Sequence, residues 1–391
     1  MDRRIAVTLG FVSVLVLPIR LEAGPKDGWV LDTVSPKKGL ADDPKDAPLI
    51  AACGAGIEAS LVVVAREVVQ ALATKGELPD AQEIEWRQRK AGNPHVWPRT
   101  WGAQVVGALD RKQLALDIKK WLGPSASRVR CGVATVRVGS GATEKEAVVV
   151  LAVEPTADLA PLPTHVKLGT WIDLDATLLS GTNGRVVVLP PTGAPKTVLS
   201  STSAGVPAHV RSRFSLAKAG RHVIQVLADD VNGPRPVLEA EVYAGVDPPT
   251  TPPSAAVPGE EKGDTVTDPI EALLRRINGA REAEGLGALT LDKGLSKVAQ
   301  SHALAMMKVK LLGHDVGDGD PAARVADAGG KWKLIGENVA KAKTERTAHR
   351  AIYASPSHRS NVLEARFKKV GIGIATDPKT GYLWIAELYG G

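Results

Sequence analysis

A proline-rich segment, DPPTTPPSAAVPGEEKG at residues 247–263, most constrains how this chain can fold. Proline lacks a backbone N–H, so five prolines in this stretch exclude a helix interior or a central strand. Proline also keeps a linker extended and semi-rigid. We therefore expect a linker at 247–266 between separately folded regions. A length of 391 residues favours two or three domains in total.

The N-terminus has the pattern of a secretory signal peptide. Arg3 and Arg4 precede an apolar run from Ile5 to Leu17, and Ala23 offers a small residue at a cleavage site. A predominantly apolar run of thirteen residues is too short to span a bilayer core comfortably. We expect residues 1–23 to be removed during export to the periplasm or the exterior, without a transmembrane segment in the mature chain. Residues 24–47, rich in charged residues, proline and glycine, then form a flexible leader.

The chain has two cysteines, Cys53 and Cys131. An even pair in an exported protein is typical of a disulfide, and we predict that these two are joined. The alternative is two buried thiols. The CxxC spacings of structural zinc sites are absent, which disfavours a cysteine metal site.

Residues 48–155 are predicted to be an α+β domain. Apolar residues recur at helical spacing over 59–72 and, more weakly, over 114–122. Two β-rich runs at 131–138 and 147–153 flank a glycine-rich turn and predict a strand pair.

In residues 160–246 the sequence pattern differs from that of the preceding domain. Short runs rich in β-branched residues lie between clusters of glycine and proline. Evenly spaced strands of this kind predict an antiparallel, Ig-like β-sandwich. The expected strands are 171–179, 185–189, 210–216, 222–228 and 237–243.

Residues 267–391 are predicted to be a second α+β domain. Asp268 can cap the first helix, with Pro269 at its first position and Glu271 in its first turn. A second helix from Asp292 to Gly313 carries His302 on its apolar stripe, as a core histidine. Two further helices are expected at 320–329 and 344–354, and strands at 370–375 and 382–388.

Four motifs in this domain occur in a family-specific order. They are Gly313-His314, the GENVA segment at 336–340, the SPSHRSNVL segment at 355–363 and the FKKVGIGI segment at 367–374. Together they resemble the CAP/SCP-like superfamily of cysteine-rich secretory and pathogenesis-related-1 proteins. The resemblance implies an α-β-α sandwich with a central cleft.

By the same resemblance, His314, Glu337 and His358 meet in that cleft. Two imidazoles with a carboxylate suit zinc or another divalent metal, with His314 and His358 as ligands, or a general acid/base pair. The family's second acid has no clear counterpart. Glu345 and His349 are alternatives for it, and Asn361 is more typical of scaffold than of chemistry.

The N-terminal domain is open to two interpretations. Its segments 131–134 and 147–150 resemble the layout of 371–388, so it is either a degenerate CAP-like domain or an unrelated α+β domain.

Charge and motifs limit the function. The net charge is +6, and residues 268–391 hold 19 basic and 14 acidic residues, but no nucleic-acid motif is present. The GxSxG, HExxH and reactive-cysteine patterns of hydrolases are also absent. We therefore expect a secreted or envelope binding module for a lipid or cell-wall fragment, rather than an enzyme. The alternatives are a metal- or His/Glu-assisted hydrolase of peptide or wall polymer, and a structural adhesion protein. The sequence leaves the oligomeric state open.

Overall fold

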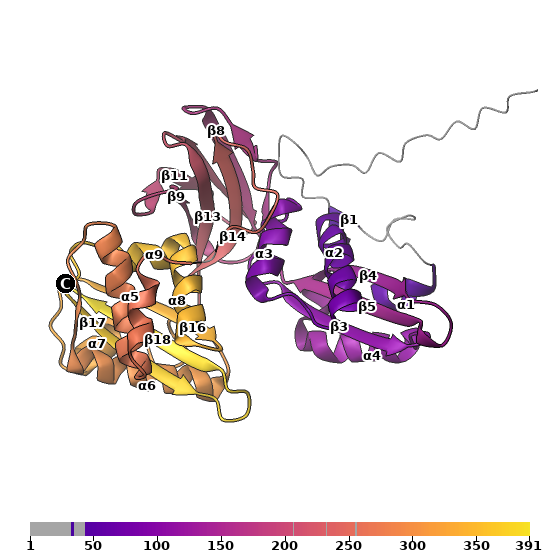
Figure 1. Cartoon of the computed structure of the whole chain (residues 1–391). Helices are drawn as coiled ribbons and strands as arrows, with labels where there is room; N and C mark the ends of the chain where they lie inside the picture. The colour runs from indigo at the N-terminus through magenta and orange to yellow at the C-terminus, as the bar shows by residue number, and fades with distance from the viewer. Residues whose placement is uncertain (1–32, 35–43, 206, 232, 255) are drawn as a thin grey trace, which may run out of the picture.

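The computed structural model describes residues 33–34, 44–205, 207–231, 233–254 and 256–391. These residues form three domains, with a β-sandwich between two α/β domains (Figure 1). The predicted signal peptide lies outside the described residues. Strand β1 (Thr33–Val34) pairs with β2 (Ile57–Glu58). This part of the predicted leader therefore belongs to the N-terminal sheet. Among the described residues, no helix has the length and apolar character that crossing a bilayer requires.

The N-terminal domain is a five-stranded sheet in the order β1-β2-β4-β5-β3, covered by helices on both faces. Helices α2 and α3 pack on one face, and α1 and α4 on the other. Its further elements are α1 (Ala47–Ile50), α2 (Ala59–Lys75), α3 (Ala81–Lys90), β3 (Arg99–Val106), α4 (Arg111–Leu122), β4 (Arg130–Val138) and β5 (Lys145–Val153).

The predicted disulfide is confirmed. Cys53, just after α1, is bonded to Cys131 on β4, with a Cα–Cα distance of 5.9 Å. Both residues lie in the core between the sheet and helices α1 and α4. The bond therefore ties the start of the domain to its central strand.

The central domain consists of two sheets that share one apolar core. Their orders are β10-β9-β13-β14-β7 and β11-β12-β8-β6. Pairing is antiparallel, as expected, except between β7 and β14, which pair in parallel at one edge. The Ig-like identity of the module stays a prediction. Its strands are β6 (Ala157–Leu159), β7 (His165–Val166), β8 (Trp171–Leu178), β9 (Thr182–Leu189), β10 (Lys196–Val198), β11 (Ser200–Thr202), β12 (Ala208–Ser215), β13 (Gly220–Asp230) and β14 (Gly233–Ala244).

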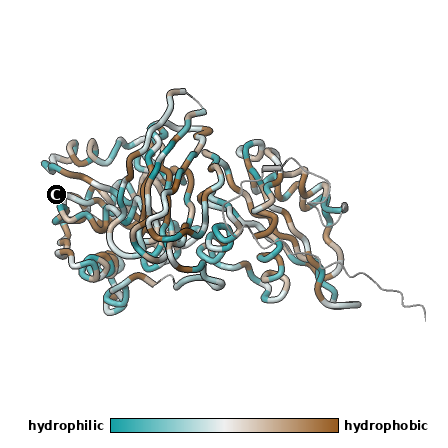
Figure 2. The backbone as a smooth tube through the Cα atoms, turned by 90° about the horizontal axis from the view of Figure 1, so that it is seen from above, coloured by the Kyte–Doolittle hydropathy of each residue, from teal (hydrophilic) through white to brown (hydrophobic). Residues whose placement is uncertain are grey.

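The C-terminal domain is an α-β-α sandwich around a sheet of order β15-β17-β18-β16. Helices α5, α8 and α9 pack on one face, and α6 and α7 on the other. Across the whole molecule, Figure 2 shows hydrophobic colouring along many of the strands and hydrophilic colouring along outer helices and loops. The elements are α5 (Pro269–Ala283), β15 (Thr290–Leu291), α6 (Lys293–Val309), α7 (Pro321–Asp327), β16 (Ile335–Ala342), α8 (Glu345–Ala354), α9 (Pro356–Val362), β17 (Lys369–Thr376) and β18 (Leu383–Gly390).

The ends of the helices can be compared with the capping residues predicted from the sequence. Asp268 caps α5 as expected, because its carboxylate accepts from the main-chain N–H of Glu271 at 2.8 Å. Helix α6 ends at Val309, earlier than the predicted stop at Gly313, because Lys310 adopts a left-handed conformation with φ 60°. Strand β16 and helix α9 were not predicted.

The second half of the predicted linker is not extended. Residues 260–265 form a 3₁₀ helix against α5, and Val257 is buried. Arg276 of α5 donates to the main-chain oxygen of Glu260, and Arg350 of α8 pairs with the Glu260 carboxylate. These contacts join the segment to the C-terminal domain.

Apart from β1 and α9, the two outer domains share one order of α-helices and strands. Helices α2 and α6 each have 17 residues, and each follows a short strand that pairs in parallel with a central strand. A β-carbon added to Gly132 would lie 2.1 Å from the carbonyl carbon of Leu61, and one added to Gly371 would lie 2.1 Å from that of Leu295. In both domains the long helix therefore rests directly on a glycine of the central sheet.

Candidate functional site

Glu337 on β16 is the centre of a polar cluster. Its Oε1 lies 2.9 Å from Nδ1 of His314 and 3.8 Å from Nε2 of His302. Its Oε2 accepts a hydrogen bond from Nη2 of Arg324 at 2.5 Å. Glu337 is only 6% exposed, so its charge is buried together with a cationic partner, as buried carboxylates require.

Different elements bring these side chains together. His302 comes from the buried face of α6, His314 from the loop after α6, and Arg324 from α7. Nη1 of Arg324 also donates to the main-chain oxygen of His314 at 2.6 Å. One guanidinium thus holds both the loop and the carboxylate. The sequence motifs predict His314 and Glu337 in one cleft, but they do not predict Arg324.

His302 is fully buried, as its place on the apolar stripe predicts. Its Nδ1 lies 2.8 Å from Asp318 Oδ2, and its Nε2 lies 2.9 Å from the main-chain oxygen of Gly313. The ring therefore anchors the loop that presents His314. Its position next to Glu337 was missed, because the stripe indicates burial but not which residue lies opposite.

His358 lies in α9, partly buried. Burial, followed by the charge of nearby His314, lowers the pKa of His358 to about 4. Its main-chain oxygen accepts a hydrogen bond from Nδ2 of Asn338 at 3.2 Å. His358 is therefore a neutral imidazole at neutral pH, and the Asn338 contact joins its helix to β16.

A second buried acid lies behind His358. Glu387 on β18 is 0% exposed and accepts hydrogen bonds from the Tyr389 hydroxyl at 2.5 Å and from Asn338 Nδ2 at 3.1 Å. Burial raises the pKa of Glu387 to about 7, although these two hydrogen bonds oppose the shift. No motif in the sequence distinguishes Glu387 from other strand residues, so it was not predicted.

The other predicted cleft residues have different partners. Asn361 donates to the main-chain oxygen of Glu337 at 3.0 Å and to Oδ1 of Asn338 at 2.9 Å, which is a scaffold role. Glu345 accepts from Nη2 of Arg276 at 3.3 Å.

His349 is fully buried on the side of α8 that faces α5, next to Tyr353. Neither of its ring nitrogens has a hydrogen-bond partner among the described residues. Burial, with a smaller effect of Arg276, lowers the pKa of His349 to about 3. The structure therefore does not bring Glu345 and His349 to the Glu337 cluster, because α8 turns both towards α5 and the segment before it.

The sandwich domain borders the cluster. A β-carbon added to Gly233, at the start of β14, would lie 3.3 Å from Cβ of His314. On the neighbouring strand β13, the Gln225 amide donates to Ser355 Oγ at 3.3 Å and accepts from the main-chain N–H of Ser357 at 3.1 Å. The hairpin of β13 and β14 therefore lies against both the His314 loop and the start of α9.

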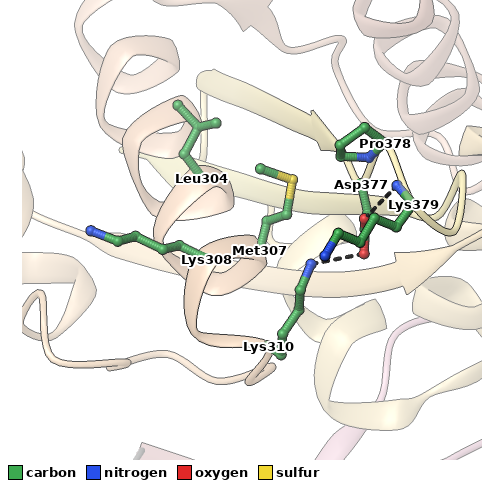
Figure 3. A pocket seen from close by; sticks show the side chains of 7 residues that line it. All are labelled: Leu304, Met307, Lys308, Lys310, Asp377, Pro378 and Lys379. Atoms are coloured by element: carbon green, nitrogen blue, oxygen red, sulfur yellow. Dashed lines mark hydrogen bonds and ion pairs between the residues drawn. The ribbon is translucent and has the colours of Figure 1, made fainter.

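A separate hollow of about 420 Å³ lies at the end of α6 (Figure 3). It is lined by Leu304, Met307, Lys308, Lys310, Asp377, Pro378 and Lys379, and it contains none of the clustered histidines.

The cluster does not fit a three-ligand metal site. Across the described ranges, no group of three or more His, Cys, Asp or Glu side chains is arranged to hold a metal ion. Arg324 binds one oxygen of Glu337, and His314 binds the other. A fixed guanidinium beside the carboxylate also repels a cation. Zinc at His314 and His358 stays a prediction.

Comparison with known proteins identifies the domain. Residues 274–389 match the family model described as CAP, the cysteine-rich secretory protein family. The uncharacterized protein YkwD of Bacillus subtilis is 29% identical over 139 residues, which cover 33% of this chain and 53% of that protein. The chain thus spans about half the length of this curated relative.

Two solved structures show further similarity. An outer surface protein from Borrelia burgdorferi is 21% identical with a TM-score of 0.30, covering 32% of this chain and 92% of that one. An extracellular protein with an SCP domain from Bacillus anthracis is 15% identical with a TM-score of 0.29, covering 57% of this chain and 81% of that one.

Proposed function

Because residues 274–389 form a CAP domain, we propose that this chain is an exported protein that binds a small ligand, a lipid or cell-wall fragment, beside His314 and His358. The Arg324–Glu337 ion pair carries the proposal. It pairs the carboxylate with a cation and leaves His314, with 19% of its side chain exposed, as an accessible polar group. Such an arrangement offers hydrogen bonds to a ligand without a free carboxylate base.

Catalysis is the second candidate, because one contact favours it. Glu337 lies 2.9 Å from Nδ1 of His314 and can orient that ring, as a carboxylate orients a general base. A hydrolase also needs an activated nucleophile or a metal-bound water. Neither follows from the donor set around Glu337, so binding is the better-supported function.

Export is supported by two independent features. The first residues have the charge and length pattern of a signal peptide. The Cys53–Cys131 disulfide agrees with an oxidising compartment, where such bonds persist. We propose that the mature chain begins near Gly24, in the periplasm or outside the cell.

We also propose that the N-terminal domain is a diverged CAP-type domain without a ligand cleft. Apart from β1 and α9, its order of α-helices and strands and its sheet pairing match those of residues 269–390. Strand register places Thr100 where the C-terminal domain has Glu337. In the N-terminal sheet, Leu151 pairs with Gly132 on one side and with Thr100 on the other. In the C-terminal sheet, Leu388 pairs with Gly371 on one side and with Glu337 on the other. The tenth residue of the long helix is Val68 in one domain and His302 in the other.

Ligand binding can be tested on the mature full chain by NMR of its histidine side chains. We would titrate two probes, palmitate and a soluble peptidoglycan fragment, into the wild type, His314→Ala and His165→Ala, and follow probe mass by mass spectrometry. His165 is the control, because it is an exposed histidine on the sandwich. Binding of one intact probe that only His314→Ala loses supports the proposal. Cleavage of a probe supports the hydrolase instead, and absence of binding to both probes contradicts the proposal for these ligand classes.

A further inference from the structure

The end of α6 and the residues after it expose an unusual number of apolar side chains. Leu304, Val309, Leu311 and Leu312 are 46%, 51%, 43% and 43% exposed. Single exposed leucines are ordinary on protein surfaces, but contiguous apolar patches are not. Four such side chains within nine residues therefore need an explanation.

Folding does not require these side chains. The opposite stripe of α6, with Leu295, Ala299 and Met306, already packs into the core against β17 and β18. The exposed residues lie outside that core. Their exposure therefore reflects something other than the packing of the domain.

Lysines lie beside Leu304 at the same end of α6. Lys308 projects from the last turn of α6, and Lys379 projects from the turn after β17, on the other side of the hollow (Figure 3). Lys310 lies between them and pairs with Asp377 at 2.8 Å. Within the described part of the chain, no carboxylate forms an ion pair with the amino groups of Lys308 and Lys379. Their charges remain available to an anionic partner.

We propose that this surface, formed by Leu304, Val309, Leu311, Leu312, Lys308 and Lys379, docks the protein on a membrane that contains anionic phospholipids. Lysines attract the negative headgroups, while leucines enter the boundary between headgroups and acyl chains. A soluble wall polyanion would use the lysines but would gain nothing from the leucines. The combination of both residue types therefore selects a lipid surface.

The surface is separate from the proposed ligand cleft, but it adjoins it in sequence. Gly313 and His314 directly follow Leu312. Docking would hold the His314 loop near the membrane, whichever ligand the cleft accepts. Failure of ligand binding in the cleft would leave this inference intact, and the reverse also holds.

The test is co-sedimentation of the mature full chain with vesicles of phosphatidylcholine, either alone or mixed with about 30 mol% of the anionic lipid phosphatidylglycerol. We expect binding to the anionic vesicles that weakens with salt. Each lysine near an anionic surface contributes roughly fivefold in affinity, so Lys308→Gln/Lys379→Gln should lose about 25-fold. Leu311→Ser/Leu312→Ser should lose roughly tenfold through lost apolar burial.

Leu199→Ser is the matched control, because Leu199 is 92% exposed on the sandwich and far from this surface in sequence. Its binding should equal that of the wild type. Circular dichroism should show that all variants fold, since the exchanged side chains are exposed. Equal binding by Leu311→Ser/Leu312→Ser and the wild type would overturn the proposal, because the surface would then recognise negative charge alone. Absence of binding to anionic vesicles would overturn it as well.

Discussion

The N-terminal and C-terminal domains have the same order of elements, but they differ in what fills equivalent positions. Where the C-terminal domain has His302, Glu337 and Glu387, strand register and helix position place Val68, Thr100 and Val150 in the N-terminal domain. The glycines under the long helices, Gly132 and Gly371, are present in both. The comparison indicates that close packing of the long helix on the sheet determines the shared architecture. The polar cluster is not needed for that architecture, because the N-terminal domain forms it without these residues.

The largest expected effect comes from reducing the disulfide of the N-terminal domain. Reduction of Cys53–Cys131, which closes a separation of 78 residues, should cost the N-terminal domain about 4.5 kcal/mol in the chain-entropy model. The C-terminal domain contains no cysteine and should be unaffected. Hydrogen exchange with and without reductant would measure this, comparing β4 and β5 with β17 and β18. Equal loss of protection in both domains would show that they do not unfold separately.

The glycine positions should respond alike. Gly132→Ala and Gly371→Ala each place a methyl group 2.1 Å from a helix carbonyl carbon, so each should destabilise its own domain by about 3 kcal/mol. Gly287→Ala is the control, because a β-carbon there meets no atom within 4 Å. Domain-resolved hydrogen exchange gives the readout. A large effect at only one of the two glycines would break the equivalence of the domains.

A fall in pH should have the next largest effect, because it should destabilise the two outer domains to different extents. The native pKa values of His349 and His358 are about 3 and about 4, below the ordinary 6.5, so the unfolded chain binds these protons first. Their stability contribution is present above pH 6.5 and is lost as the pH falls. Glu387, with a pKa of about 7, acts in the opposite direction between pH 7 and 4.5. The contribution of Glu387 offsets that of one histidine, and the contribution of the other histidine remains. The free energy of unfolding of the C-terminal domain should therefore fall by about 2 kcal/mol between pH 6.5 and pH 5.

In the N-terminal domain, the stability that Glu146 contributes should be lost only at lower pH. Burial alone would raise the pKa of Glu146, but hydrogen bonds, chiefly from Arg111, outweigh it and lower the pKa to about 2. The contribution of Glu146 is therefore present above pH 4.5 and is lost below it. Urea unfolding monitored by domain-resolved exchange at pH 6.5 and pH 5 measures both domains. His349→Phe should make the C-terminal response nearly flat in this window, and an unchanged slope would contradict the assignment.

The smallest expected effect concerns the contact between the β13–β14 hairpin and His314. Gly233→Ala adds a β-carbon 3.3 Å from Cβ of His314, at a position with φ 98°, and should cost about 1 kcal/mol. The hairpin should then move away from His314, and diethylpyrocarbonate should modify that ring a few times faster, because local opening controls its access. His209, 45% exposed on the sandwich, supplies the reference rate. An unchanged ratio of the two rates would show that the hairpin does not restrict access.

The sequence predicts the elements with strong apolar periodicity and misses the weakly patterned ones. Helix α2 and strands β4 and β5 follow from long runs of valine, leucine and alanine. Helix α3 was missed because its sequence, AQEIEWRQRK, is almost entirely polar. Strand β16 was missed because a motif, rather than a β-rich run, occupies it.

The candidate site was predictable only where a motif marked it. The motifs named His314, Glu337 and His358, but Arg324 and Glu387 reach the same region through packing of α7 and β18. An arginine on a short helix and a glutamate in a strand carry no local signal of their partners. The contacts that hold the Glu337 carboxylate in place are tertiary, and single-sequence patterns do not contain them.

The β13–β14 hairpin has a mechanical consequence. Its strand β14 contacts the N-terminal domain through the Leu238–His95 bridge, while Gln225 of β13 bonds the start of α9. The two strands are paired from Gly220–Ala244 to Asp230–Gly233, so they move as one stiff body. A pulling force between the N-terminal domain and the C-terminal domain is therefore transmitted along this ribbon to the rim of the His314 cluster. Tension between the outer domains would therefore load the contacts that border the His314 cluster directly.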